Sequence, residues 1–328
     1  MSKVTGYLSV IILAYNRRDY ILNAVRSVLG QTLDRDLFEI IVIKNFKDDM
    51  IDGYLERNSV KNIFSVHQTL GGKISEALDY SIGNIVCLLE DDDRFVKDKL
   101  KYVYDTFNKY PYLTYYHNGH CNNTNENDLD KCFKVVSDDC DYWNSIKKLY
   151  KRGGGFNLSS MSIKKEFLIK HREKYKSFTY QVDGFISFLV VDNREKFLKD
   201  DRKLTVYYYH SSASRNLKDY RAFAEYNLEN VQNVLGEKDK MISYLKTVDV
   251  QNIFIGDRSF LMIKHCINSG RACNNFFLSF RLLMKYSLSD FKTKAGLTFL
   301  YILSRISHRA TLKLFYLIEP SYVGNVGN

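Results

Sequence analysis

Four consecutive acidic residues, Glu90 to Asp93, follow directly after the apolar run IVCLL at 85–89. Neighbouring carboxylates repel one another, so such a cluster costs stability unless a cation neutralises it. A hard divalent ion with oxygen ligands is the natural cation, and in a crevice it commonly bridges the phosphate oxygens of a ligand. The alternative is a solvated turn in which Asp93 caps a helix over 96–108. The cluster therefore predicts either metal-assisted phosphate chemistry or a simple exposed turn.

The elements that would position this cluster alternate between two patterns over the first hundred residues. Apolar runs at 7–15, 38–45, 62–67 and 84–90 predict strands, and helical spacing of apolar residues predicts helices between them. Strands that are apolar on both faces and separated by helices form a parallel sheet, and ligands bind at the carboxyl ends of its strands. Tyr15-Asn16, Lys44-Asn45 and the acidic cluster each follow a strand end. We therefore expect all three to converge on one crevice.

The second half of the chain has a different organisation. Strands are predicted at 112–118, 156–163 and 203–210, and helices at 164–173 and from Asp183 onward. Further helices are predicted at 216–235, 238–247, 251–269, 273–287 and 289–308. The sequence thus predicts an α/β domain over 1–212 and a helical region over 213–328.

Composition limits the partners and the compartment. The net charge of +10 favours anionic partners such as nucleotides or phospholipid surfaces. The aromatic residues read as core strands, so nucleic acid is not expected. The six cysteines form no CxxC pair and no secretory signal precedes them, so we expect reduced thiols and a cytoplasmic protein. No apolar run approaches the roughly 18 to 20 residues of a membrane span, which leaves peripheral attachment to the cytoplasmic face of a membrane as an option.

Three segments, taken in order, carry a resemblance to a known family. They are SVIILAYNRRDYILNAVRSVLGQT at 9–32, EIIVIKN at 39–45 and GGKISEALDYSIGNIVCLLEDDD at 71–93. A strand ending in Tyr-Asn, a helix ending in Ser-x-x-x-Gln-Thr, and an apolar strand ending in an Asp-x-Asp motif resemble the nucleotide-binding half of a family 2 glycosyltransferase of the GT-A fold. The resemblance implies a doubly wound, mostly parallel sheet with a C-terminal helical extension. It also implies nucleotide-sugar binding by residues 1–110 and an acceptor side over 111–212.

Glu90 and Asp92 fall on the two acidic positions of the family's motif. By resemblance, Glu90 faces the ribose and metal side, and Asp92 ligates Mn²⁺ or Mg²⁺ on the donor diphosphate. Asp93 continues the motif toward the donor sugar. Asp91 also belongs to the nucleotide-sugar-binding set, although its side chain, at the x position, is expected to turn away from the crevice.

The base pocket shows one departure from the family. Ala14, Tyr15 and Asn16 would line it, but Lys44-Asn45 stands where the family usually carries an aspartate that reads the base. A lysine ammonium only donates hydrogen bonds. Lys44 is therefore expected either to bond a base carbonyl or to point away while Asn45 takes over, and the identity of the base stays open.

The acceptor side resembles the family more loosely, through GGGFNLSSMSI at 153–163 and YQVDGFISFL at 180–189. The resemblance makes Asp183, at a helix start, the general base that deprotonates the acceptor hydroxyl; helix capping is its alternative role. His210, at the end of a strand, is expected near the metal. Lys73 and Arg215 are candidates for the diphosphate charge.

These features imply an inverting, metal-dependent glycosyltransferase. It would move a sugar from a UDP- or GDP-linked donor to a glycan or lipid-linked acceptor. A sugar-nucleotide nucleotidyltransferase is disfavoured, because no glycine- and arginine-rich phosphate loop follows the first strand. The alternative from another class is a non-catalytic glycosyltransferase-like module that binds nucleotide or glycan, or scaffolds a membrane assembly. The basic, partly apolar helices over 273–318 have three readings: a packed core with a solvated side, attachment to an anionic membrane surface, or a homo-oligomer interface.

Overall fold

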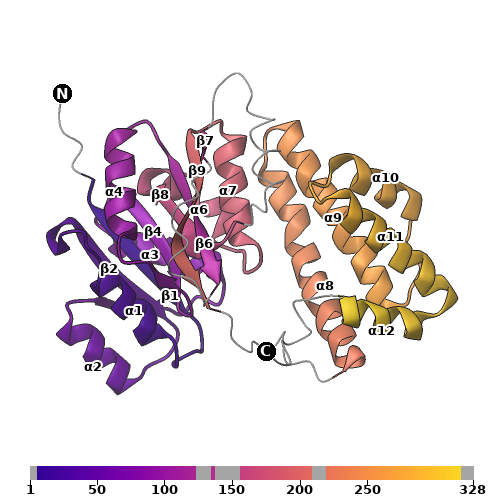
Figure 1. The fold of residues 1–328 in the computed structure, drawn as a ribbon, viewed down its shortest axis with the longest axis horizontal. Helices are drawn as coiled ribbons and strands as arrows, with labels where there is room; N and C mark the ends of the chain where they lie inside the picture. Colours follow the sequence, from indigo (N-terminus) through magenta and orange to yellow (C-terminus); the bar gives the residue numbers. More distant parts are fainter. Residues whose placement is uncertain (1–5, 123–133, 137–155, 209–218, 319–328) are drawn as a thin grey trace. The chain divides into compact units, whose positions relative to one another are not determined.

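The computed structural model describes residues 6–122, 134–136, 156–208 and 219–318. The chain divides into two compact units, residues 1–209 and 210–328. Figure 1 draws the first unit from indigo to pink and the second from orange to yellow.

The first unit is built on one mixed sheet with the strand order β3-β2-β1-β4-β8-β6-β9-β5, and β7 pairs with β9. The pairs β3–β2, β2–β1 and β1–β4 are parallel, and β6 is parallel to β9. β8 is antiparallel to both β4 and β6, and β5 and β7 are antiparallel to β9. The predicted α/β fold is therefore confirmed, as a mixed sheet in which four of the described strand pairs are parallel and four are antiparallel. The strands are β1 (Leu8–Ala14), β2 (Phe38–Lys44), β3 (Lys61–Phe64), β4 (Ile85–Glu90), β5 (Arg94–Phe95), β6 (Tyr115–Asn122), β7 (Lys134–Val136), β8 (Met161–Lys164) and β9 (Phe197–Tyr207).

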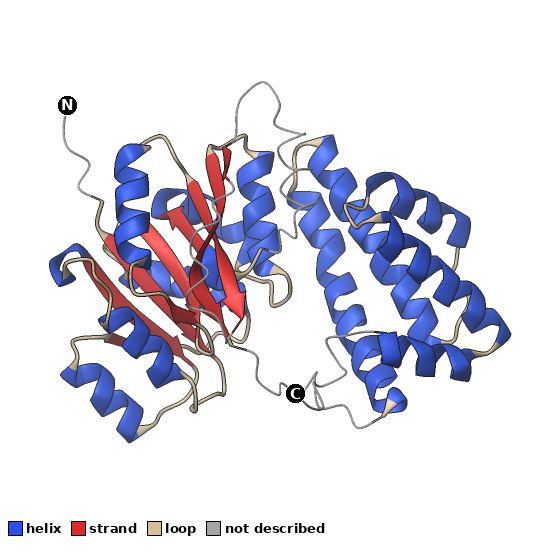
Figure 2. Cartoon of the chain, viewed as in Figure 1, coloured by secondary structure: helices blue, strands red, loops and turns tan. Residues whose placement is uncertain are grey.

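Helices cover both faces of this sheet (Figure 2), which explains why every residue of β1 and β2 is buried. Alternate residues of β1, such as Val10 and Ile12, share one apolar core with side chains of α1, α2 and α4. The side chains of α3 lie outside that core and contact β1 and β2 from the other face. The helices are α1 (Ile21–Leu29), α2 (Asp49–Arg57), α3 (Leu70–Tyr80), α4 (Lys99–Lys109), α6 (Lys165–Tyr175) and α7 (Val182–Asp192), with short 3₁₀ turns η1 (Arg35–Leu37) and η2 (Leu158–Ser160).

The start of α3 lies very close to the end of α6. Thr69 caps α3 by accepting a hydrogen bond from the Gly72 N–H at 3.0 Å, and its hydroxyl donates to the Lys176 carbonyl at 2.7 Å. A Cβ on Gly71 would lie 1.9 Å from the Tyr175 carbonyl oxygen, so only glycine fits there. This packing fixes the helix that carries Lys73.

The second unit consists of helices in its described part, and its core includes Phe223, Ile263, Leu283 and Leu297. The predicted break between helices at 235–238 is wrong, because one continuous helix runs through Gly236. An isolated glycine costs a helix only about 1 kcal/mol, and buried Val234, Lys238 and Met241 continue the packed side beyond it. None of the helices that the structure describes combines the length and the hydropathy of a membrane span. The helices are α8 (Tyr220–Tyr244), α9 (Val248–Ser269), α10 (Phe276–Tyr286), α11 (Phe291–Ile306) and α12 (His308–Ile318).

Candidate functional site

The three strand ends singled out from the sequence do lie side by side. The parallel register places Ala14 of β1 opposite Lys44 of β2, and Leu13 opposite Glu90 of β4. The turns after these strands therefore meet at one edge of the sheet, because parallel strands end together. The Ala14 side chain is buried in the apolar core, so its main chain is the part that remains for the predicted base pocket.

Asp91 and Asp92 are joined by a residue that the sequence analysis missed. Arg17 donates from one guanidinium nitrogen to Asp91 Oδ1 and from the other to Asp92 Oδ2, the latter at 2.5 Å. Asp91 Oδ2 also accepts a hydrogen bond from the Tyr15 N–H at 3.4 Å. Asp91 is expected to turn away from the crevice; in the structure its carboxylate is fully buried and takes its partners from the residues just after β1. The position of Arg17, directly after the Tyr-Asn turn, was the available signal.

Lys73 joins the same group from α3. Its ammonium lies 3.9 Å from the centroid of the Tyr15 ring, within cation–π distance. Burial lowers the pKa of Lys73, and the nearby Asp91 carboxylate opposes this shift. The Tyr15 hydroxyl donates to Gln68 Oε1 at 3.2 Å. Tyr15, Lys73 and Asp91, all three in the predicted donor set, therefore form one electrostatically coupled cluster.

Of the two readings of Lys44, the structure selects the one in which it points away. Its side chain is 1% exposed. Its ammonium pairs with Asp52 Oδ1 of α2 at 2.7 Å and donates to the Phe46 carbonyl at 2.6 Å. A buried ammonium requires such partners, so Lys44 serves the packing of β2 against α2 and leaves the predicted donor set.

Asn45, the next residue, bonds to the turn after β1 instead. Its Oδ1 accepts a hydrogen bond from the Asn16 N–H at 2.9 Å, and its Nδ2 donates to Asn16 Oδ1 at 2.8 Å. Asn16 has a left-handed backbone with φ of 56°, which asparagine adopts more readily than most residues. The two amides thus hold the first two turns together.

Asp93 links the acidic cluster to the main chain just after β9. Its Oδ1 accepts a hydrogen bond from the Tyr208 N–H at 3.1 Å, while its Oδ2 is buried without a hydrogen-bond partner among the described residues. Burial raises the pKa of Asp93 to about 6; the Ser159 hydroxyl opposes this shift, and the neighbouring Asp92 adds to it. Burial likewise raises the pKa of Asp91 to about 6 in spite of the opposing Arg17 charge.

Lys99 is a second residue that the sequence analysis missed. It is fully buried, and its ammonium donates to the Ser159 carbonyl at 2.5 Å and to Thr205 Oγ1 at 3.0 Å. Burial lowers its pKa to about 7, although the Asp93 charge counteracts this. Ser159 Oγ in turn accepts a hydrogen bond from the Glu90 N–H at 3.0 Å. Lys99 therefore ties η2 and β9 to the strand end that carries the acidic cluster. Its place on the apolar side of a predicted helix was the only signal.

Asp183 approaches the cluster from the first turn of α7. Burial raises the pKa of Glu90 well above its ordinary value, and the charges of Asp93, Asp92 and Asp183 raise it further. Asp183 is thus near enough to Glu90 for their charges to interact. Asp183 Oδ1 also accepts a hydrogen bond from the N–H of the next residue, Gly184, at 2.7 Å, while the N-cap of α7 is Gln181. His210 and Arg215 lie outside the described residues.

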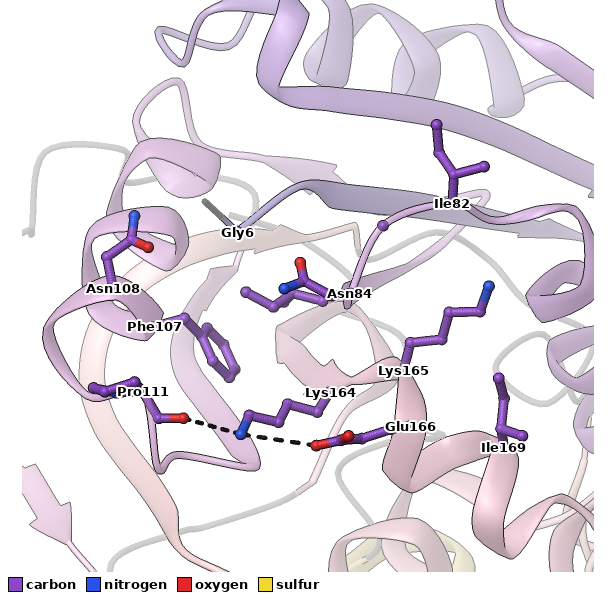
Figure 3. A pocket seen from close by; sticks show the side chains of 12 residues that line it. Gly6, Ile82, Asn84, Phe107, Asn108, Pro111, Lys164, Lys165, Glu166 and Ile169 are labelled. Carbon is purple, nitrogen blue, oxygen red and sulfur yellow. Dashed lines mark hydrogen bonds and ion pairs between the residues drawn. The ribbon is translucent and has the colours of Figure 1, made fainter. Parts of the chain in front are cut away.

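A separate pocket of about 490 Å³ lies at the opposite ends of the strands (Figure 3). Its lining includes Gly6 before β1, Ile85 at the start of β4 and Phe107 of α4. The Lys164 ammonium in its wall already donates to the Pro111 carbonyl at 2.9 Å and lies 3.8 Å from Glu166. This pocket contains no residue of the acidic cluster and is not part of the candidate site.

Fold and site together define an α/β protein that gathers acidic and amide side chains at the carboxyl ends of parallel strands. Residues 9–183 match the family model described as glycosyl transferase family 2. This is more than half of the chain, which therefore belongs to glycosyl transferase family 2, and the resemblance seen in the sequence is confirmed.

Individual relatives are more distant. An uncharacterized glycosyltransferase of Nostoc sp. is 32% identical over 105 residues, which cover 30% of this chain and 32% of that protein. The match thus spans about a third of this curated relative's length. The crystal structure of S. aureus TarS 1–349 in complex with UDP-GlcNAc has a TM-score of 0.58 at 14% identity, covering 95% of this chain and 91% of that one. The mannosyltransferase PcManGT from Pyrobaculum calidifontis, in complex with GDP-Man and Mn²⁺, has a TM-score of 0.57 at 13% identity, covering 96% and 82%. At these identities the two structures show a shared fold.

Proposed function

We propose that this protein is an inverting, metal-dependent glycosyltransferase that transfers a sugar from a nucleotide-diphosphate donor to a hydroxyl of a glycan or lipid-linked acceptor. The observation that carries the proposal is the meeting of Glu90, Asp92 and Asp183 at the carboxyl edge of a family 2 sheet. The solved structures with the same fold support a donor of the UDP- or GDP-linked class, because their ligands are UDP-GlcNAc and GDP-Man.

The acidic cluster has the chemistry to hold Mn²⁺ or Mg²⁺. Its oxygen ligands suit a hard cation, and the carboxylates of Asp92, Asp93 and Asp183 lie near enough to Glu90 for their charges to raise its pKa. The described residues contain no group of three or more His, Cys, Asp or Glu side chains arranged as a metal site. Asp92 would therefore hold the ion together with the donor's own phosphate oxygens, and with His210, which lies outside the described part. When bound, the ion supplies positive charge that offsets the charge of the departing diphosphate.

Arg17 has a defined part in this scheme. In the structure its guanidinium pairs with both Asp91 and Asp92. We infer that Arg17 keeps the two carboxylates in place before the donor arrives and releases Asp92 on donor binding. Lys73, beside Tyr15, and Arg215 would then contact the diphosphate as fixed positive charges.

Asn16 and Asn45 would contact the base. Each side-chain amide has both donor and acceptor capacity beyond their mutual bonds, so the pair can satisfy a uracil or a guanine edge. Lys44 cannot contribute, because its ammonium is buried against Asp52. The base specificity therefore depends on Asn45 and the Tyr15 turn.

Asp183 would act as the general base. It takes the proton of the acceptor hydroxyl as that oxygen attacks the anomeric carbon, and the bond from this carbon to the diphosphate oxygen breaks with its electron pair leaving on the nucleotide. Attack on the face opposite the leaving group inverts the anomeric centre. A positioned base of this kind typically contributes about 10² to 10⁴-fold to the rate.

The experiment separates donor binding from proton transfer. Binding of UDP- and GDP-sugars with Mn²⁺ is measured by calorimetry, and transfer or donor hydrolysis is measured by nucleotide release. Asp92→Asn should weaken donor binding in the presence of metal. Asp183→Asn should leave binding within about twofold and lower transfer by roughly 10² to 10⁴-fold. Asp105→Asn, in an exposed pair with Lys101, is the matched control and should change neither. The proposal fails if no nucleotide sugar binds, and the assignment of the base fails if Asp183→Asn transfers normally.

A further inference from the structure

Helix α11 exposes an apolar stripe on the side opposite to its packed face. Its packed face buries Leu297, Leu300 and Tyr301. On its other side, Phe291, Phe299, Ile302 and Ile306 are 72%, 58%, 54% and 80% exposed. These positions, with the exposed Ala295 between the first two, follow one another at intervals of three or four residues. Such spacing places them on one side of a helix, so the exposed residues form a continuous stripe.

The two flanking helices add exposed apolar residues. Helix α11 contacts both α10 and α12, and these three helices make up the C-terminal part of the chain in Figure 1. Phe277 and Leu278 at the start of α10 are 85% and 55% exposed, and Leu317 and Ile318 at the end of α12 are 68% and 52% exposed. A continuous apolar stripe such as that of α11 marks a binding face, whereas singly scattered exposed residues do not.

The charge of this surface indicates what covers it. Between residues 276 and 318 the chain carries one acidic residue, Asp290, against seven lysines and arginines. One of the seven, Lys294, is buried and donates to the Met284 carbonyl. The other six are exposed, and they are Arg281, Lys285, Lys292, Arg305, Arg309 and Lys313.

An anionic bilayer surface complements this face better than a second copy of the chain. A two-fold interface would bring the same basic patch against itself, and like charges across an interface are costly. Anionic phospholipids instead provide phosphate groups for the basic residues and an apolar layer, just beneath the headgroups, for the phenylalanines and isoleucines.

We propose that α10, α11 and α12 form a membrane-binding face, in which the apolar stripe of α11 enters the headgroup boundary of an anionic bilayer and the flanking basic residues contact lipid phosphates. This places the protein on the membrane surface without a spanning helix in its described part. The inference rests on the helical unit alone and is independent of the chemistry proposed for the sheet edge.

The test is flotation of the full-length protein with vesicles. We expect it to float with vesicles of phosphatidylcholine and phosphatidylglycerol and to remain at the bottom with phosphatidylcholine alone. Raising the salt concentration should release the protein, because each basic residue at the surface contributes about fivefold to partitioning through a screened interaction.

Two triple variants separate the face from exposed apolar residues in general. Phe291→Ser, Phe299→Ser and Ile306→Ser together should reduce partitioning at least about tenfold. The matched control is Met50→Ser, Ile82→Ser and Tyr112→Ser, three residues of the α/β unit that are 70%, 70% and 56% exposed, and it should float like the wild type. Circular dichroism and donor binding verify that both variants are folded.

Three outcomes would overturn the proposal. The first is a wild-type protein that ignores anionic vesicles. The second is equal flotation of the two triple variants. The third is a doubling of the mass in light scattering that the stripe variant abolishes while vesicles are not bound, since the face would then join two copies of the chain.

Discussion

Asp93→Asn should change the pH dependence of stability in a defined direction. The folded state raises the pKa of Asp93 from 3.8 to about 6, because the carboxyl is buried beside Asp92. A carboxyl with a raised pKa contributes its full stability below the pKa of the unfolded chain and loses it as the pH rises through the folded pKa. The wild type should therefore lose free energy of unfolding relative to the variant between about pH 4 and pH 7.

The size of this effect follows from the shift. A difference of about two pH units corresponds to roughly 3 kcal/mol in total, of which roughly 2 kcal/mol falls between about pH 4.5 and 7.5. Asparagine keeps an oxygen for the Tyr208 N–H but places an amide nitrogen where Asp93 Oδ2 has no described partner. That unpaired group costs about 1 to 3 kcal/mol at every pH. The test therefore compares how the difference in free energy of unfolding between wild type and variant changes with pH. The sign of that difference at a single pH is not diagnostic.

Urea unfolding of both proteins at a series of pH values measures this change. Asp105→Asn, whose carboxylate is 58% exposed, is the matched control and should follow the wild type in parallel. Mn²⁺ should stabilise the wild type more at about pH 7.5 than at about pH 5, because more of the cluster is ionised at the higher pH. If the free energy of unfolding of wild type and Asp93→Asn changes with pH in parallel, the inference that the fold raises the pKa of Asp93 is refuted.

Three further predictions concern single positions. Lys99→Met should lower the free energy of unfolding more at high pH than at low pH. The folded state lowers the pKa of Lys99 from 10.5 to about 7, so the stability that Lys99 contributes is lost as the pH falls toward 7, by up to about 1.4 kcal/mol per pH unit. Unfolding of both proteins at about pH 6 and pH 9 measures this change. Arg17→Ala should raise the affinity for Mn²⁺ in the absence of nucleotide by on the order of tenfold, because it removes the guanidinium that pairs with Asp92. Electron paramagnetic resonance of free Mn²⁺ measures this affinity. An unchanged affinity would contradict the inference that Arg17 must release Asp92 before the metal binds. Gly256→Ala should lower stability by about 1 to 3 kcal/mol, because its Cβ would lie 2.3 Å from the Ser287 nitrogen. Gly236→Ala should raise stability by up to about 1 kcal/mol, because its Cβ would meet nothing within 4 Å. The melting temperatures of the two variants should therefore move in opposite directions.

Much of the site could be predicted from the sequence, because it depends on the order of strands and helices along the chain. Parallel strands separated by helices end at the same edge, so the positions of Tyr15, Asn45 and Asp92 after strands were enough to predict their convergence. The helical boundaries were less secure, since Gly236 signals a break but is overridden by the packed side of α8. The turn η2 was also missed, because an apolar run that ends in a strand does not reveal a preceding 3₁₀ turn.

By itself, the sequence determined the class of fold, the family and the edge of the sheet at which the acidic residues gather, since these follow from hydropathy patterns and from motifs of adjacent residues. Only the tertiary structure decided which way individual side chains turn. Lys44 pairs with Asp52, Asp91 pairs with Arg17, and Lys99 donates to the Ser159 carbonyl. The physical reason is that a buried charge is placed by its partner, and two of these partners, Arg17 and Ser159, lie 60 or more positions away in the chain. No local pattern records a partner at that distance.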